Sequence, residues 1–107
     1  MTIDYKRALE TAYIGAAEAE RERGLGCCRV YITFNEVDGK GIAKAAKALQ
    51  KAGMSSCIFQ KKAYYGLVNA LYVGYDNCDG KALAKATAMI AKLKEFGISA
   101  HREECGD

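Results

Sequence analysis

Hydrophobic and polar residues alternate in two short stretches of the chain, RVYITFN at 29–35 and ALYVGYD at 70–76. Alternation with a period of two is typical of a strand with one buried face. Each stretch is followed by a run whose apolar residues recur every three or four positions, which predicts an amphipathic helix. These positions are Ile42, Ala45, Ala46 and Leu49 in the first helix and Leu83, Ala86, Ile90 and Leu93 in the second.

Each predicted helix is expected to end at a glycine, Gly53 or Gly97, because glycine readily adopts the left-handed conformation that closes many helices. A second short strand then follows in each copy, SSCIFQ at 55–60 and ISAHRE at 98–103. The sequence therefore predicts the order strand, helix, strand twice over.

The two halves are also similar in sequence. VDGKGIAKAAK at 37–47 returns as CDGKALAKATA at 78–88, an offset of 41 positions. Two βαβ units in one small domain most simply form a four-stranded antiparallel sheet of order 4-1-3-2 with both helices on one face. We therefore predict an α+β chain with a ferredoxin-like βαββαβ core over 27–105.

A further helix is predicted ahead of this core, over residues 3–23, and Gly24 and Gly26 are expected to end it. Its apolar stripe consists of Tyr5, Leu9, Ala12, Tyr13 and Ala16. The chain has 107 residues, which suits a single domain over 1–107.

The repeated Asp-Gly-Lys motif has two interpretations. Asp38 and Asp79 could be N-caps, whose carboxylates accept bonds from the first free N–H groups of each helix. Alternatively, the loop could bind a phosphate at a helix N-terminus. A carboxylate in that place would repel a phosphate, and the two loops would lie at opposite ends of the sheet. We therefore favour capping.

Charge is unevenly distributed along the chain. The formal net charge is +3, and no acidic residue occurs from 39 through 75. Lysines of both repeat helices are predicted to form one basic outer face, either a solvated surface or a binding site for an acidic macromolecule. The candidate partner-binding residues are Lys40, Lys44, Lys47, Lys51, Lys81, Lys85 and Lys92.

The other face of the sheet is predicted to carry an aromatic row. If Val30, Ile32 and Phe34 face the helices, Tyr31 faces away from them. On the neighbouring strand, Leu71, Val73 and Tyr75 are expected to face the helices. The predicted row consists of Phe59, Tyr72, Tyr31 and His101. It could be covered by the N-terminal helix, buried in a homodimer, or exposed for stacking on bases.

Five cysteines are present without a CxxC motif. Cys27, Cys28, Cys78 and Cys105 are expected toward one end of the sheet, where a zinc site or a disulfide is conceivable. We expect free, buried thiols and no metal or cofactor, because the count is odd and no signal peptide or membrane-spanning run is visible, which predicts a cytoplasmic protein. The single histidine, His101, has no carboxylate pair or metal motif around it, so no enzyme is expected.

Two family resemblances bear on function. V30-Y31-I32 resembles the start of the first-strand motif of RNA-recognition domains, which implies RNA or DNA binding by the sheet. The segments D38-G39-K40-G41-I42-A43 and A52-G53-M54-S55 resemble the ACT family of small-molecule-sensing domains. That resemblance implies an effector, such as an amino acid, near the first loop at a dimer interface.

A third class of function is preferred. In size and in lacking an active site the chain is similar to phage-encoded inhibitors of host defence, including anti-CRISPR proteins. We therefore predict a small non-catalytic interaction protein that docks through its basic helical face on a nucleic acid or a nucleoprotein complex, with no membrane partner.

Overall fold

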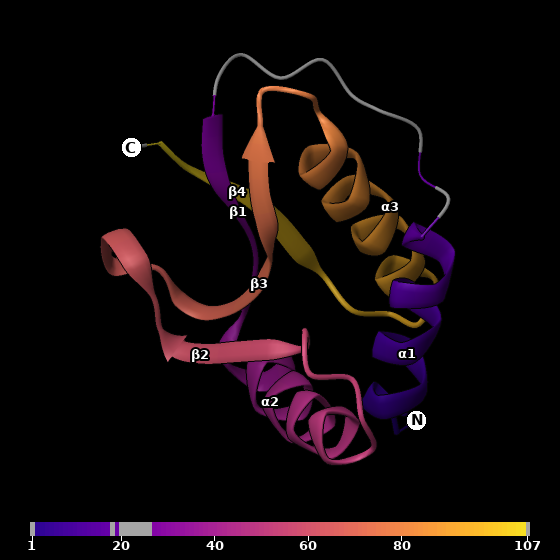
Figure 1. Ribbon diagram of the computed structural model, residues 1–107. Helices are drawn as coiled ribbons and strands as arrows, with labels where there is room; N and C mark the ends of the chain where they lie inside the picture. The colour runs from indigo at the N-terminus through magenta and orange to yellow at the C-terminus, as the bar shows by residue number, and fades with distance from the viewer. Residues whose placement is uncertain (1, 18, 20–26, 107) are drawn as a thin grey trace.

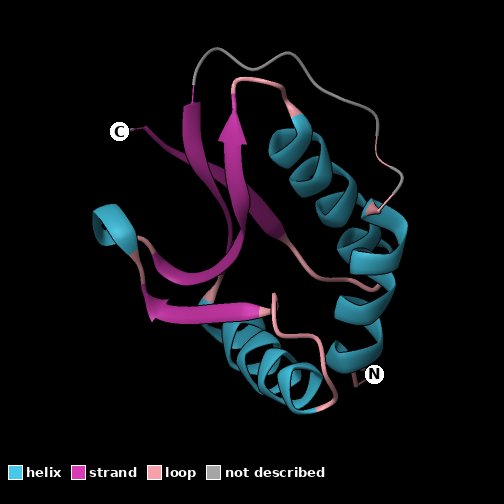
Figure 2. Cartoon of the chain, in the orientation of Figure 1, coloured by secondary structure: helices cyan, strands magenta, loops and turns pink. Residues whose placement is uncertain are grey.

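The computed structural model describes residues 2–17, 19 and 27–106 (Figure 1). This part of the chain folds into three α-helices and a four-stranded antiparallel sheet, which confirms the α+β class (Figure 2). In chain order the elements are α1 (Tyr5–Ala16), β1 (Cys27–Phe34), α2 (Glu36–Lys51), β2 (Ile58–Lys62), the short 3-10 helix η1 (Tyr64–Gly66), β3 (Val68–Asn77), α3 (Lys81–Glu95) and β4 (Ala100–Gly106).

The sheet has the order β2-β3-β1-β4, which is 4-1-3-2 when it is counted from the β4 edge. β1 is antiparallel to both of its neighbours, with Tyr31 opposite Tyr72 of β3 and Thr33 opposite His101 of β4. The two loops that follow β1 and β3 consequently lie at opposite ends of the sheet.

Helix α1 is shorter than predicted and lies in an unexpected place. It ends at Ala16, and Ala17 is in a turn. The other residues of the predicted helix, 18 and 20–23, and the stop expected at Gly24 and Gly26 lie outside the described residues. Instead of covering the aromatic face of the sheet, α1 packs against both α2 and α3 (Figure 1). The alternative that α1 covers that face is therefore wrong.

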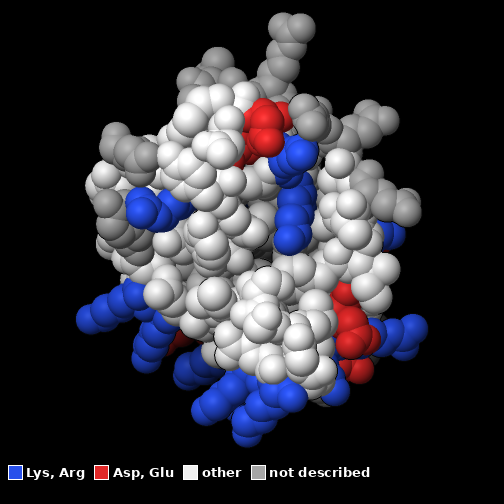
Figure 3. All heavy atoms as spheres, in the orientation of Figure 1, with Lys and Arg blue, Asp and Glu red and all other residues white. Residues whose placement is uncertain are grey.

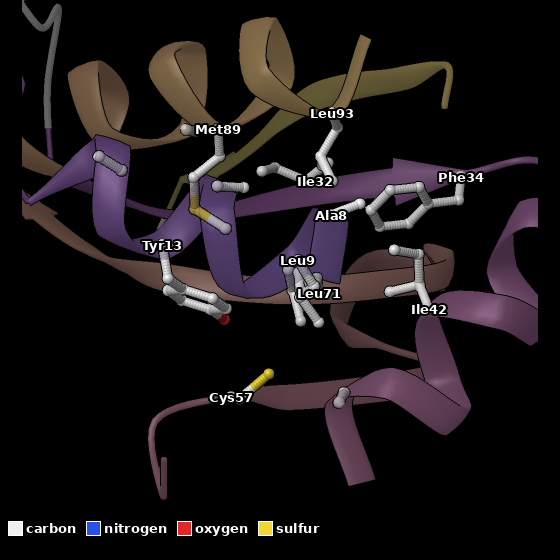
Figure 4. Close-up of a cluster of buried hydrophobic side chains, with 14 of the residues drawn as sticks. Ala8, Leu9, Tyr13, Ile32, Phe34, Ile42, Cys57, Leu71, Met89 and Leu93 are labelled. Carbon is white, nitrogen blue, oxygen red and sulfur yellow. The ribbon is translucent and has the colours of Figure 1, made fainter. Parts of the chain in front are cut away.

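One hydrophobic core holds the three helices on the same face of the sheet. Leu9 of α1, Ile42 of α2 and Leu93 of α3 are fully buried together with Ile32 and Leu71 of the sheet (Figure 4). Each such side chain contributes roughly 1.5–3 kcal/mol when it leaves water. The predicted stripe of α2 is buried throughout. In α3, by contrast, Leu83, Ala86 and Leu93 are buried, Met89 joins them and Ile90 is only half-buried.

The predicted glycine stops are confirmed. Gly53 and Gly97 have φ angles of 108° and 84°, the left-handed region in which other residues are strained. In each case the next residue donates its N–H to the carbonyl of a buried leucine: Met54 to Leu49 at 2.9 Å and Ile98 to Leu93 at 3.0 Å. Both repeats thus end their helix with the same six-to-one turn.

The N-caps differ from the prediction. Asn35 caps α2, because its Oδ1 accepts the N–H of Asp38 at 2.7 Å, while its Nδ2 donates to Asp38 Oδ2 at 3.2 Å. Asp38 is therefore a helix residue in the first turn. The corresponding position in the second repeat is Asp76, which is fully buried and accepts the N–H groups of Gly80 at 3.0 Å and Leu83 at 3.2 Å.

Asp79 is only a minor contributor at the start of α3. Its Oδ1 accepts the N–H of Lys81 at 3.1 Å from an exposed position, and the N-cap itself is Gly80. The prediction that Asp38 and Asp79 are the caps is therefore wrong in detail. The side chains that accept the first N–H groups of the helices are Asn35 and Asp76, which are also 41 positions apart. The repeat still marks where each helix begins.

A bulge in β3 changes which side chains face the helices. The β1–β3 register shifts between Val30 and Tyr31, so one extra β3 residue is inserted there. One added residue moves every later side chain to the opposite face. Tyr75 therefore lies opposite Arg29 and is 41% exposed, and the prediction that it points into the core is wrong.

Candidate functional site

A row of lysines follows the outer side of α2. Lys40, Lys44, Lys47 and Lys51 are all exposed, and their spacing of three or four residues places them on one side of the helix. The helix buries Ile42 and other apolar residues on the opposite side. The first half of the predicted basic face is therefore present as expected.

The only acidic residue buried in this helix is held by neighbours. Asp38 is 7% exposed, and its Oδ1 accepts a 2.7 Å hydrogen bond from the Tyr5 hydroxyl. This hydrogen bond raises the pKa of Tyr5, and burial adds to the effect. Since Asn35 donates to the other carboxylate oxygen, Asp38 is turned inward, away from the lysine row.

Strand β2 extends the positive charge beyond α2. Lys61 and Lys62 end this edge strand, both exposed, and β2 packs against α2. Figure 3 shows basic side chains gathered along the lower side of the molecule, where α2 and β2 lie. We call the six residues Lys40, Lys44, Lys47, Lys51, Lys61 and Lys62 the basic surface.

The lysines of α3 do not continue this surface as predicted. Lys81 is exposed, but Lys85 and Lys92 are half-buried against α1. The ammonium of Lys85 lies 5.4 Å from the centre of the Tyr13 ring, a cation–π distance. The Lys92 stem packs close to Gly15, and its Nζ lies 3.3 Å from a Glu95 carboxylate oxygen. A single basic face across both repeat helices is therefore wrong, because α1 lies between them.

The aromatic face of the sheet is only partly as predicted. The centroids of the Tyr31 and Tyr72 rings are 5.2 Å apart, and the ring planes are tilted by 60° relative to each other. Tyr31 is buried in a second small cluster with Ala70 and Cys105, against which Ala63 and Leu67 of the β2–β3 connection pack. His101 is exposed on this face opposite Thr33. Burial of Tyr31 in dimers stays a prediction, but part of its cover comes from its own chain.

Phe59 does not belong to this row. It lies opposite Leu71, which faces the helices, and it packs against the main core. Ile58 takes the place next to Tyr72 and is 40% exposed. The prediction for Phe59 is wrong because the β2 register is set by its pairing with β3, which alternation within β2 alone does not specify.

Two of the five cysteines are bonded. Cys27 at the start of β1 and Cys78 just after β3 form a disulfide, which corrects the expectation that all thiols are free. Cys28, Cys57 and Cys105 are free and buried. Burial raises the pKa of each of these three thiols. They are therefore protonated at neutral pH and weak as nucleophiles or metal ligands.

Metal-ligand clusters and membrane-spanning helices are both absent from the described part of the chain. Within residues 2–17, 19 and 27–106, no three His, Cys, Asp or Glu side chains come together as a set of metal ligands. In the same residues, no helix combines the length and apolar character needed to cross a membrane.

Sequence reasoning missed Asn35 and Asp76 as caps, and it missed Lys61 and Lys62 as part of the basic surface. The Asn35-x-x-Asp38 spacing was the available signal for the first cap, because it is a form of capping box. The position of α1, which separates Lys85 and Lys92 from the lysines of α2, has no local signal in the sequence.

Comparisons with protein-family models, with curated proteins and with solved structures found no match for this chain.

Proposed function

We propose that this chain is a small non-catalytic interaction protein that docks through its basic surface on a nucleic acid or a nucleoprotein complex. The observation that supports this is the set of six exposed lysines on α2 and β2, within a stretch of sequence that has no acidic residue. The inward orientation of Asp38 keeps its carboxylate from neutralising them.

The dimensions of the lysine row fit an extended anionic partner. Lys40 and Lys51 are separated by roughly 16 Å along the helix axis at a rise of ~1.5 Å per residue. Duplex DNA carries one negative charge per ~1.7 Å of its axis, so several phosphates fall within this length. Lysines on a convex helix favour backbone attraction over base reading. An inhibitor of the anti-CRISPR kind, which blocks a nucleoprotein by occupying such a surface, is the narrower form of this proposal.

The other two candidate functions have less support. Base stacking on the sheet would use Tyr31, which is 5% exposed, and Phe59, which belongs to the main core. An ACT-like effector site near the first loop would need space beside Gly41. The Tyr5 ring lies against that glycine, so a Cβ there would collide with it.

The ferredoxin-like label for residues 27–105, the single domain over 1–107 and a cytoplasmic location belong to this proposal. The strand order and the repeated helix endings support the label. The Cys27–Cys78 disulfide counts against the cytoplasm, because disulfides persist mainly in oxidising compartments.

The test measures binding of fluorescein-labelled 20-base-pair DNA (about two helical turns) and of a single-stranded RNA of similar length by anisotropy at low and moderate salt. Lys44→Glu with Lys47→Glu should weaken binding about tenfold or more and flatten its salt dependence. The matched control is Lys81→Glu with Lys94→Glu, two exposed lysines of α3 outside the basic surface. Equal loss in both pairs, or no binding by wild type at low salt, would overturn direct docking on nucleic acid.

A further inference from the structure

A pocket of about 410 Å³ opens where the start of α2 meets the β2–β3 hairpin. It lies at one end of the basic surface, because Lys61 and Lys62 form part of its wall. Phe34 and Val68 form the apolar part of the wall. Glu36 and Asn69 contribute polar side chains to it.

The junction beneath this pocket is tightly packed. Asn69 has a φ of 50°, an uncommon left-handed conformation, and its side chain lies against the backbone of α2 at Gly39. A Cβ added to Gly39 would come within 2.8 Å of Asn69 Cγ. This contact holds the first turn of α2 close to the start of β3, where Asn69 lines the pocket.

Exposed apolar side chains occur in the wall of this pocket and close to its wall residues in the chain. Val68 in the wall is 54% exposed, and Val37, which follows Glu36 in the first turn of α2, is 75% exposed. Tyr65, in the connection between Lys62 and Val68, is 65% exposed. Single exposed apolar residues are ordinary, but Val68 lies in the wall of a pocket and Val37 directly follows another wall residue, Glu36, which favours a contact surface here.

We infer that this pocket holds an apolar side chain from an acidic segment of a protein, so that the partner of the basic surface presents protein at this end. The inference rests on the proposed function and goes further, because it assigns the class of the partner surface. Phosphates and sugars offer little to aliphatic side chains such as Val37 and Val68. Protein interfaces, in contrast, combine an apolar anchor in a pocket with a polar rim. Here Lys61 and Lys62 outnumber the one carboxylate of the wall, Glu36, which favours an acidic segment.

The probe is a labelled acidic peptide of about nine residues, made of Glu and Asp around one central leucine, long enough to span roughly 30 Å when extended. A second peptide has serine in place of the leucine, and a single-stranded DNA of about 20 nucleotides, an extended chain that tracks basic grooves, is the nucleic-acid probe. The leucine peptide should bind about tenfold more tightly than the serine peptide, since burial of one leucine side chain corresponds to at least that factor. Amide NMR signals near Val37 and Val68 should shift on binding.

The variant Val37→Ser with Val68→Ser should abolish the difference between the two peptides. Ile14→Ser is the matched control, because Ile14 is 70% exposed on α1 and outside this pocket. Equal affinity of both peptides for wild type would overturn the inference. The inference would also be overturned if neither peptide binds and the valine variant weakens the binding of the DNA.

The two proposals fail in different ways. If Lys44→Glu with Lys47→Glu weakens every anionic probe while the valine variant changes nothing, the pocket inference alone is wrong. If the lysine variant leaves all probes bound as in wild type, the proposed function itself is wrong.

Discussion

The Tyr5 hydroxyl donates a 2.7 Å hydrogen bond to Asp38 Oδ1 and thereby joins the start of α1 to the first turn of α2. The Tyr5 ring lies directly against Gly41, one helical turn further along. Helix α1 therefore fixes the position of the helix that carries the lysine row, and at the same time holds that helix's buried carboxylate away from the lysines.

Replacing Tyr5→Phe removes this hydrogen bond and keeps the ring contact. The expected loss is about 1.5–3 kcal/mol of unfolding free energy, the usual range for a hydrogen bond to a charged group. Urea denaturation followed by circular dichroism measures it. Gly41→Ala should cost more, because the added methyl group collides with the ring. A Tyr5→Phe protein as stable as wild type would show that the bond contributes nothing.

The Cys27–Cys78 disulfide predicts a dependence of stability on reductant. It joins residues 51 positions apart, and closing a loop of that length restricts the unfolded chain by ~4 kcal/mol in the chain-entropy model. A phosphine reductant should therefore lower the melting temperature of wild type by roughly 15 °C, at about 4 °C per kcal/mol for a domain of this size. The Cys27→Ser, Cys78→Ser double variant should melt near the reduced wild type and ignore the reductant. If the melting temperature of wild type is unchanged by the reductant, the two cysteines are not bonded in solution.

Asp76 and Asp79 lie three residues apart, yet substitution should affect them very differently. Asp76→Asn replaces a fully buried acceptor of two N–H groups and should destabilise the protein by about 2 kcal/mol. Asp79→Asn changes an exposed bond to one N–H and should cost less than about 0.5 kcal/mol. Thermal melts of both variants at neutral pH provide the comparison. A larger effect at Asp79 would restore it as the main cap of α3.

Local pattern was enough to predict the two repeat helices, the strands and both glycine stops, but not the end of α1. Apolar periodicity places Leu49 and Leu93 in the core, and only glycine easily takes the φ angles seen at Gly53 and Gly97. The local pattern could not show that Asp76, and not Asp79, caps α3, since an Asp at either position could accept hydrogen bonds from the first N–H groups of the helix.

The remaining errors come from contacts between distant segments. Phe59 and Tyr75 lie on the opposite face from the one predicted, because strand register and the bulge are set by pairing with another strand. The stripe of α1 indicates that it is buried, but not that it lies between α2 and α3. The loss of Lys85 and Lys92 from the candidate site follows from that one placement.

The three buried thiols should make the stability of the protein depend on pH in the alkaline range. Cys57 is fully buried beside Tyr13 (Figure 4), and burial raises its pKa as it does those of Cys28 and Cys105. Below the unfolded-chain pKa of ~8.5 both states hold the thiol proton, so stability does not depend on it. Above that pH the unfolded chain loses the proton while the folded chain keeps it. Stability should therefore fall as pH rises, by up to ~1.4 kcal/mol per pH unit for each thiol.

Urea midpoints between about pH 7.5 and 9.5 test this, a range that ends below the ordinary pKa of tyrosine at ~10. Cys57→Ala should be less stable than wild type at neutral pH, because a buried sulfur is lost, but its stability should fall less steeply with rising pH. Cys27→Ser with Cys78→Ser is the control, since a disulfide has no thiol proton to release and its removal should leave the slope unchanged. A Cys57→Ala protein with the same pH slope as wild type would show that the Cys57 thiol titrates alike in the folded and unfolded chains.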